Sequence, residues 1–79
     1  MALVSRVERD DHSFRSLHPT KLVCKYIVGA HDGKKVLQLN TYGSEDRDIP
    51  DKLSQTLQFD EAAAKQLYRI LQKEYGFTG

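Results

Sequence analysis

The dipeptide Asp32-Gly33 stands between two runs of alternating apolar residues and constrains the fold more than any other feature. A two-residue type I′ turn needs positive φ at both central positions, which Asp and Gly tolerate. We therefore predict a strand over residues 21–30, a tight turn, and a second strand over residues 35–42. The two strands are expected to pair antiparallel as a hairpin.

A third strand and a helix are predicted in the last part of the chain. Residues 54–59 alternate between apolar and polar side chains, with Leu57 and Phe59 on one face. Asp60 is a good N-cap for a helix that runs to about Tyr75, and Gly76 is a natural residue to end it. The helix carries one apolar stripe, formed by Ala63, Leu67, Ile70, Leu71 and Tyr75.

These elements predict an α+β fold with an antiparallel sheet of three to four strands and one C-terminal helix packed on one face. With 79 residues the chain forms one domain. We assign residues 1–12 to a loose N-terminal arm, about 13–59 to the sheet and 60–76 to the helix. A short edge strand near Phe14 and Leu17 would be the fourth strand. Cys24 lies on an apolar strand face and is expected to be a buried, unreactive thiol.

The two sheet faces differ in character. Leu37, Leu39, Leu57 and Phe59 are predicted to meet the helix. The opposite face is polar but largely uncharged, and is a solvent-facing surface, a binding surface or a dimer seam; it carries Gln38, Asn40, Tyr42, Ser54, Thr56 and Gln58. Val23, Ile27 and Val36 lack an evident cover, which favours a homodimer because small domains commonly bury such surface between subunits.

The sequence does not favour an enzyme. No nucleophile–base pair and no glycine-rich phosphate loop is present, so we predict no catalytic residue and no cofactor. One cysteine and three scattered histidines give no metal-ligand spacing, and no metal site is predicted. The acidic residues between Glu45 and Asp51 lack the central glycine and terminal glutamate of a calcium loop.

Charge distribution favours a nucleic-acid ligand. Residues 1–35 hold seven Lys/Arg against four Asp/Glu, whereas residues 36–60 hold two against five. Basic side chains track a phosphate backbone, and tyrosines offer faces on which bases stack. We therefore predict single-stranded DNA or RNA binding by residues of the polar sheet face and its basic flanks: Lys25, Tyr26, Lys34, Lys35, Gln38, Asn40, Tyr42, Arg47, Lys52 and Gln58.

The order of strands, a polar loop and the segment KLSQTLQF-DEAAAKQLYRIL resembles the family of single-stranded-DNA-binding transcriptional coactivators, the positive-cofactor-four fold. The resemblance covers residues 21–71. It implies a curved antiparallel sheet, a dimer formed through the helix and single-stranded DNA as ligand. The strand VLQLNTY lacks the Trp and the several Lys/Arg usual there in that family. The stretch LQLNTYGSEDR also resembles a small bacterial and phage family of unassigned function.

A second class of function stays open. A protein-interaction or inhibitor module, such as a phage accessory protein acting on a host complex, would use the polar face and the loop from Glu45 to Asp51 as its epitope. The apolar runs are too short for a membrane span and the charged start does not resemble a secretory signal. A single cysteine suits a reducing compartment, so a cytoplasmic location is expected.

Overall fold

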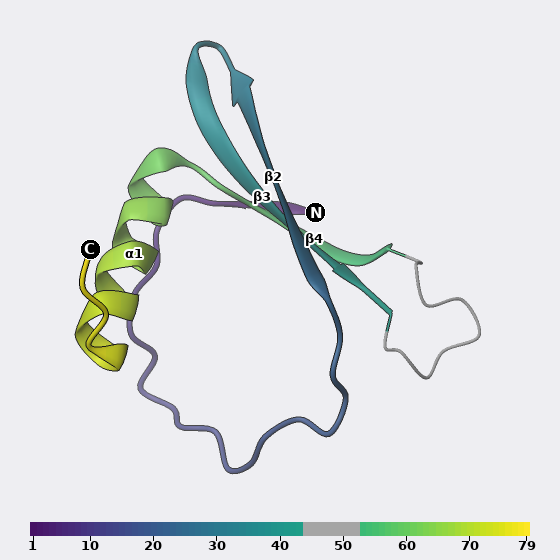
Figure 1. Cartoon of the computed structure of the whole chain (residues 1–79), viewed down its shortest axis with the longest axis vertical. Coiled ribbons are helices and arrows are strands. Elements are labelled where there is room, and N and C mark those ends of the chain that lie inside the picture. Colours follow the sequence, from purple (N-terminus) through teal and green to yellow (C-terminus); the bar gives the residue numbers. More distant parts are fainter. Residues whose placement is uncertain (44–52) are drawn as a thin grey trace.

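The computed structural model describes residues 1–43 and 53–79. These residues form one four-stranded sheet and one helix, and the helix lies beside the sheet (Figure 1). The sheet has the strand order β1-β4-β3-β2. This confirms the predicted α+β class, with the helix last in the chain. In chain order the elements are β1 (Ala2–Val4), β2 (Cys24–His31), β3 (Lys34–Tyr42), β4 (Leu53–Phe59) and α1 (Glu61–Tyr75).

The hairpin forms where the sequence predicts it. Asp32 and Gly33 have φ values of 52° and 76°, the positive pair that a type I′ turn requires. Strands β2 and β3 pair antiparallel on either side of the turn, with His31 opposite Lys34 and Cys24 opposite Thr41. β2 begins three residues later than predicted, at Cys24 instead of Lys21.

The prediction of a purely antiparallel sheet is wrong in one detail. Residues 2–4, placed in the loose arm, form β1 and pair parallel with β4, with Leu3 opposite Gln58. The sheet is therefore mixed. No strand forms near Phe14 and Leu17; residues 5–23 instead follow a long loop from β1 past the helix and back to β2 (Figure 1).

Helix α1 begins and ends as its capping residues predict. The Asp60 carboxylate accepts a hydrogen bond from the Ala63 backbone N–H at 2.9 Å, and Gly76 adopts the left-handed conformation with φ of 73°. Phe77 turns back so that its ring stacks on Tyr75, with 5.1 Å between ring centroids. Within residues 1–43 and 53–79 we find no helix with the length and apolar character needed to cross a bilayer.

The core between helix and sheet is small. Register places Leu37 opposite Phe59 and Leu39 opposite Leu57, so these side chains share the face on which α1 contacts β3 and β4. Phe59 and Ala63 are the buried apolar residues of the described chain, 8% and 0% exposed. The expectation that Cys24 is buried is wrong: its thiol is exposed, because β2 is an edge strand and the helix packs mainly on β3 and β4.

Replacing the helix cap gives a first test of this architecture. Asp60→Ala removes the acceptor for the Ala63 N–H and should lower the free energy of unfolding by about 0.5–2 kcal/mol. Urea denaturation followed by circular dichroism measures the loss. Asp60→Asn, which keeps a capping oxygen, is the control and should retain most of the stability; equal losses in both variants would contradict the capping role.

Candidate nucleic-acid interface

A basic two-stranded ribbon projects from the sheet. β3 pairs with β4 only from Leu37 onward, so residues 29–36 of the β2–β3 hairpin extend past the end of β4 (Figure 1). This ribbon carries Lys34 and Lys35, both exposed, and a single acid, Asp32. The Asp32 carboxylate lies 3.3 Å from the His31 ring. Within the described residues no carboxylate lies within ion-pair distance of either lysine.

A cation and an aromatic ring meet at the other end of the same strand pair. The Lys25 ammonium lies over the Tyr42 ring, 4.9 Å from its centroid, within the range of a cation–π contact. Lys25 sits opposite Asn40 in the β2–β3 register, two residues from Tyr42 on the same face of β3. Lys25 and Tyr42 therefore form one local site that presents a charge and a ring together.

The amides predicted as ligand contacts bond to one another. Gln58 Nε2 donates to Gln38 Oε1 at 3.0 Å, and Gln38 Nε2 donates to Asn40 Oδ1 at 3.0 Å. The Thr56 hydroxyl donates to the same Asn40 oxygen at 3.1 Å. Asn40 and Thr56 are only 5% and 8% exposed. We call this hydrogen-bonded set, formed by the amides of Gln38, Asn40 and Gln58 and the hydroxyl of Thr56, the amide chain. It stabilises the sheet, and only the two partly exposed glutamines remain accessible to a ligand.

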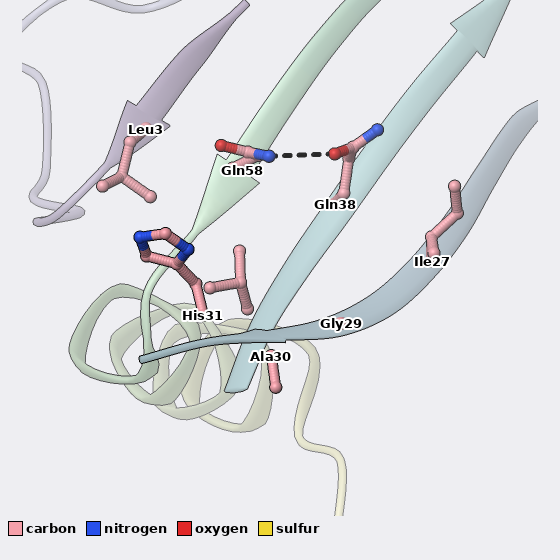
Figure 2. Close-up of a pocket in the computed structure, with 8 residues that line it drawn as sticks. Leu3, Ile27, Gly29, Ala30, His31, Gln38 and Gln58 are labelled. Carbon is pink, nitrogen blue, oxygen red and sulfur yellow. Dashed lines mark hydrogen bonds between the residues drawn. The ribbon is translucent and has the colours of Figure 1, made fainter. Parts of the chain in front are cut away.

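A pocket of about 370 Å³ lies on the face opposite the helix (Figure 2). Its floor is one row across the sheet, because the register aligns Leu3, Gln58, Gln38 and Ile27 on four successive strands. The pocket extends to the base of the ribbon, where Gly29, Ala30, His31 and Val36 complete its lining. Apolar walls around an amide pair are typical of small-ligand sites, and the volume is near the lower end of their range.

The structure brings together some of the predicted contact residues and separates others. Lys25, Gln38, Asn40, Tyr42 and Gln58 share the face that carries the pocket. Tyr26 lies on the opposite face, opposite Leu39, and is 73% exposed. Lys34 and Lys35 lie on the ribbon, and Arg47 and Lys52 lie outside the described residues, as does the predicted epitope between Glu45 and Asp51.

Sequence reasoning missed part of the pocket lining. Leu3 was assigned to the arm, and Ile27 and Val36 were identified only as an apolar patch in need of cover. The patch was a usable signal, because unexplained apolar side chains on a polar face often mark a binding surface. Leu3 gave no such signal, since its place depends on a pairing with β4 some fifty residues away.

Charged groups of the loop over residues 5–23 contact their neighbours in the loop and, in one case, the helix. The Asp10 carboxyl has a lowered pKa because the His12 backbone N–H donates to it at 2.9 Å and the His12 ring bonds to the same oxygen at 2.7 Å. Arg6 pairs with Glu8 at 3.5 Å, and Arg9 lies 4.0 Å from Glu74. In the described part of the chain, no three His, Cys, Asp or Glu side chains gather as a metal site requires.

Comparison of the chain with protein families, with curated proteins and with solved structures gave no match.

Proposed function

We propose that this chain is a non-enzymatic module that binds single-stranded nucleic acid through the basic ribbon and the adjoining sheet face. The observation that carries the proposal is the pair Lys34 and Lys35 on the projecting hairpin, with no carboxylate in ion-pair distance among the described residues. Lysines held apart from acids are available to phosphates, and each phosphate that they neutralise releases bound counterions.

The sheet face beside the ribbon supports the same ligand class. Tyr42 offers a ring for base stacking, and the Lys25 ammonium over it adds a charge for the neighbouring phosphate. The pocket at the base of the ribbon has the size and the mixed apolar and amide lining suited to one flat, polar heterocycle. A single strand would run from the ribbon across this pocket toward Tyr42.

The salt dependence of binding tests the proposal. Fluorescence anisotropy with labelled single-stranded DNA and RNA, at two or more salt concentrations, should show an affinity that falls as salt rises. Lys34→Ala combined with Lys35→Ala should reduce the slope of log affinity against log salt by about 1.4, since each contact to a single strand contributes about 0.7. Lys65→Ala combined with Lys73→Ala is the matched control, because both residues are exposed on the helix and the net charge changes equally.

The outcomes separate the candidate functions. If the two double variants reduce the slope equally, binding depends on overall charge and the ribbon is not the site. If the parent protein binds neither DNA nor RNA at low salt, the proposal is wrong. A protein-interaction module is then the better candidate, since large apolar side chains on β2 and α1 are exposed, among them Tyr26, Val28 and Tyr75.

A further inference from the structure

Strand β2 is a long, open sheet edge. It is the last strand in the order β1-β4-β3-β2, and all eight of its residues are exposed. β1, at the opposite edge, has only three residues. No element within residues 1–43 or 53–79 pairs with the outer side of β2.

The register shows which backbone groups of β2 face outward. The Tyr42 N–H donates to the Val23 carbonyl at 3.1 Å, which makes Val23 and Tyr42 a hydrogen-bonded pair. Such pairs alternate along an antiparallel ladder, so Lys25, Ile27, Gly29 and His31 also point their N–H and C=O groups toward β3. The alternate residues Cys24, Tyr26, Val28 and Ala30 therefore present theirs to the open edge.

This edge lacks the features that natural sheets use to prevent pairing. It contains no proline and no bulge, and Lys25 is its one charged residue between Cys24 and Ala30. Tyr26, Ile27 and Val28 are all more than half exposed. A row of unpaired backbone groups flanked by exposed apolar side chains is a template for another strand.

The chain exposes more surface than a compact monomer of its mass, and the excess is large enough to supply an interface. The accessible surface is 7360 Å². A compact monomer of 9.0 kDa would expose about 4,900 Å². The radius of gyration is 14.7 Å, against about 12 Å for a compact chain of this length. The excess surface is well above the roughly 800 Å² per partner that a standard interface buries.

We propose that two copies of this chain join through β2, paired antiparallel about a two-fold axis at Ile27, to form one continuous sheet. This register sets Tyr26 opposite the partner's Val28 and Cys24 opposite the partner's Ala30. All four outward residues of each strand then exchange both of their backbone hydrogen bonds. Centring the axis on Tyr26 or on Val28 leaves at least one outward residue of the strand without a partner in the other strand.

The side chains also fit this register. Tyr26 against the partner's Val28 is an aromatic and β-branched pair on the face that carries the helix, a combination that stabilises sheets. Lys25 falls opposite the partner's Gly29, so no like charges face each other. In the single chain a Cβ at Gly29 would meet nothing within 4 Å and its φ is not positive, so nothing within the chain requires glycine there. In the dimer, the missing side chain leaves room for the partner's Lys25.

A cysteine cross-link tests the register directly. Ala30→Cys places a new thiol opposite the partner's native Cys24 in a hydrogen-bonded pair, whose Cα separation of about 5.5 Å suits a disulfide. Within one strand the two thiols lie about 20 Å apart and cannot react with each other. Mild oxidation should convert most of the variant into a covalent dimer on a non-reducing gel. Val28→Cys is the matched control, because its new thiol faces another thiol only in the registers centred on Tyr26, where it meets Cys24, and on Val28, where it meets its own counterpart.

A backbone change tests the interface without oxidation. The Val28 N–H points away from β3, so Val28→Pro removes an outward donor and leaves the β2–β3 ladder intact, as edge strands allow. The parent should show about twice 9.0 kDa by light scattering. Val28→Pro should weaken dimerisation at least about tenfold, since each dimer loses two hydrogen bonds. Val28→Ala keeps the donor and should dimerise more tightly than the proline variant.

Three results would overturn the proposal. The first is a parent that stays at 9.0 kDa up to millimolar concentration while Ala30→Cys stays uncross-linked. The second is a dimer whose affinity is unchanged by Val28→Pro, because its interface would then lie at another surface. The third is preferential cross-linking of Val28→Cys. None of these measurements includes nucleic acid, so their results do not test the proposed ligand. Conversely, a failure to bind DNA or RNA would not contradict the proposed dimer.

Discussion

Phe59→Ala should remove a large part of the free energy of unfolding. Phe59 is 8% exposed and is the one large side chain that the helix and sheet bury among the described residues. Truncating a buried phenylalanine costs about 3–5 kcal/mol. A domain of this size has about 4–12 kcal/mol of stability in total, so the loss is a substantial part of it. Urea denaturation monitored by circular dichroism measures the effect.

Leu71→Ala is the matched comparison for this prediction. Leu71 belongs to the predicted apolar stripe of the helix but is 37% exposed, so its truncation should cost clearly less than that of Phe59. The sequence pattern places both residues between the helix and the sheet, whereas in the structure Phe59 is buried there and Leu71 is partly exposed. Equal losses would show that the later turns of the helix pack on the sheet as tightly as the first turn, around Ala63, does.

Local patterns predicted the elements that local chemistry determines. The Asp32-Gly33 turn, the Asp60 cap and the Gly76 end depend on residues that are neighbours in the chain, and all three are confirmed. The alternation in β3 and β4 also placed Leu37, Leu39, Leu57 and Phe59 on one face, as the register shows. In each case the determining contacts span only a few residues.

Strand β1 could not be predicted because its signal is not local. Its three residues are too few to show a period, and they pair with residues 57–59. The segment that follows is anchored to the distant helix by the Val7 backbone N–H, which donates to Gln66 Oε1 at 2.7 Å, and by Arg9, which lies 4.0 Å from Glu74. Alternation within a strand likewise predicts which face a residue occupies, but it does not predict the order of the strands in the sheet. The edge position of β2 was therefore not predictable, and Cys24 was wrongly expected to be buried.

The sequence predicted the types of residue in the candidate site better than it predicted how these residues are arranged. Sequence reasoning identified the lysines of the hairpin and Tyr42, because charge and aromatic character are properties of single residues. It treated the side chains of Gln38, Asn40 and Gln58 as free to contact a ligand. Their bonding to one another follows from the β3–β4 register, which sets Gln38 opposite Gln58 and Asn40 opposite Thr56.

Asn40→Ala should produce the second large effect, on stability and not on ligand binding alone. Asn40 Oδ1 accepts hydrogen bonds from both Gln38 Nε2 and the Thr56 hydroxyl in a site that is 5% exposed. Removing it leaves two donors without their acceptor, at a cost of about 1–3 kcal/mol for each one that stays buried. Thr56 is the more deeply buried of the two donors and should account for most of the loss.

A double-mutant cycle with Thr56→Val isolates that contribution. Thr56→Val keeps the shape of the side chain and removes the donor, so alone it should cost only about 1 kcal/mol. Combined with Asn40→Ala it should cost less than the sum of the two single changes, because the donor that Asn40→Ala leaves unpaired is then absent. Urea midpoints of the four proteins give the coupling. Strict additivity would mean that the hydroxyl finds another acceptor, and the amide chain would then hold the sheet together less than its geometry indicates.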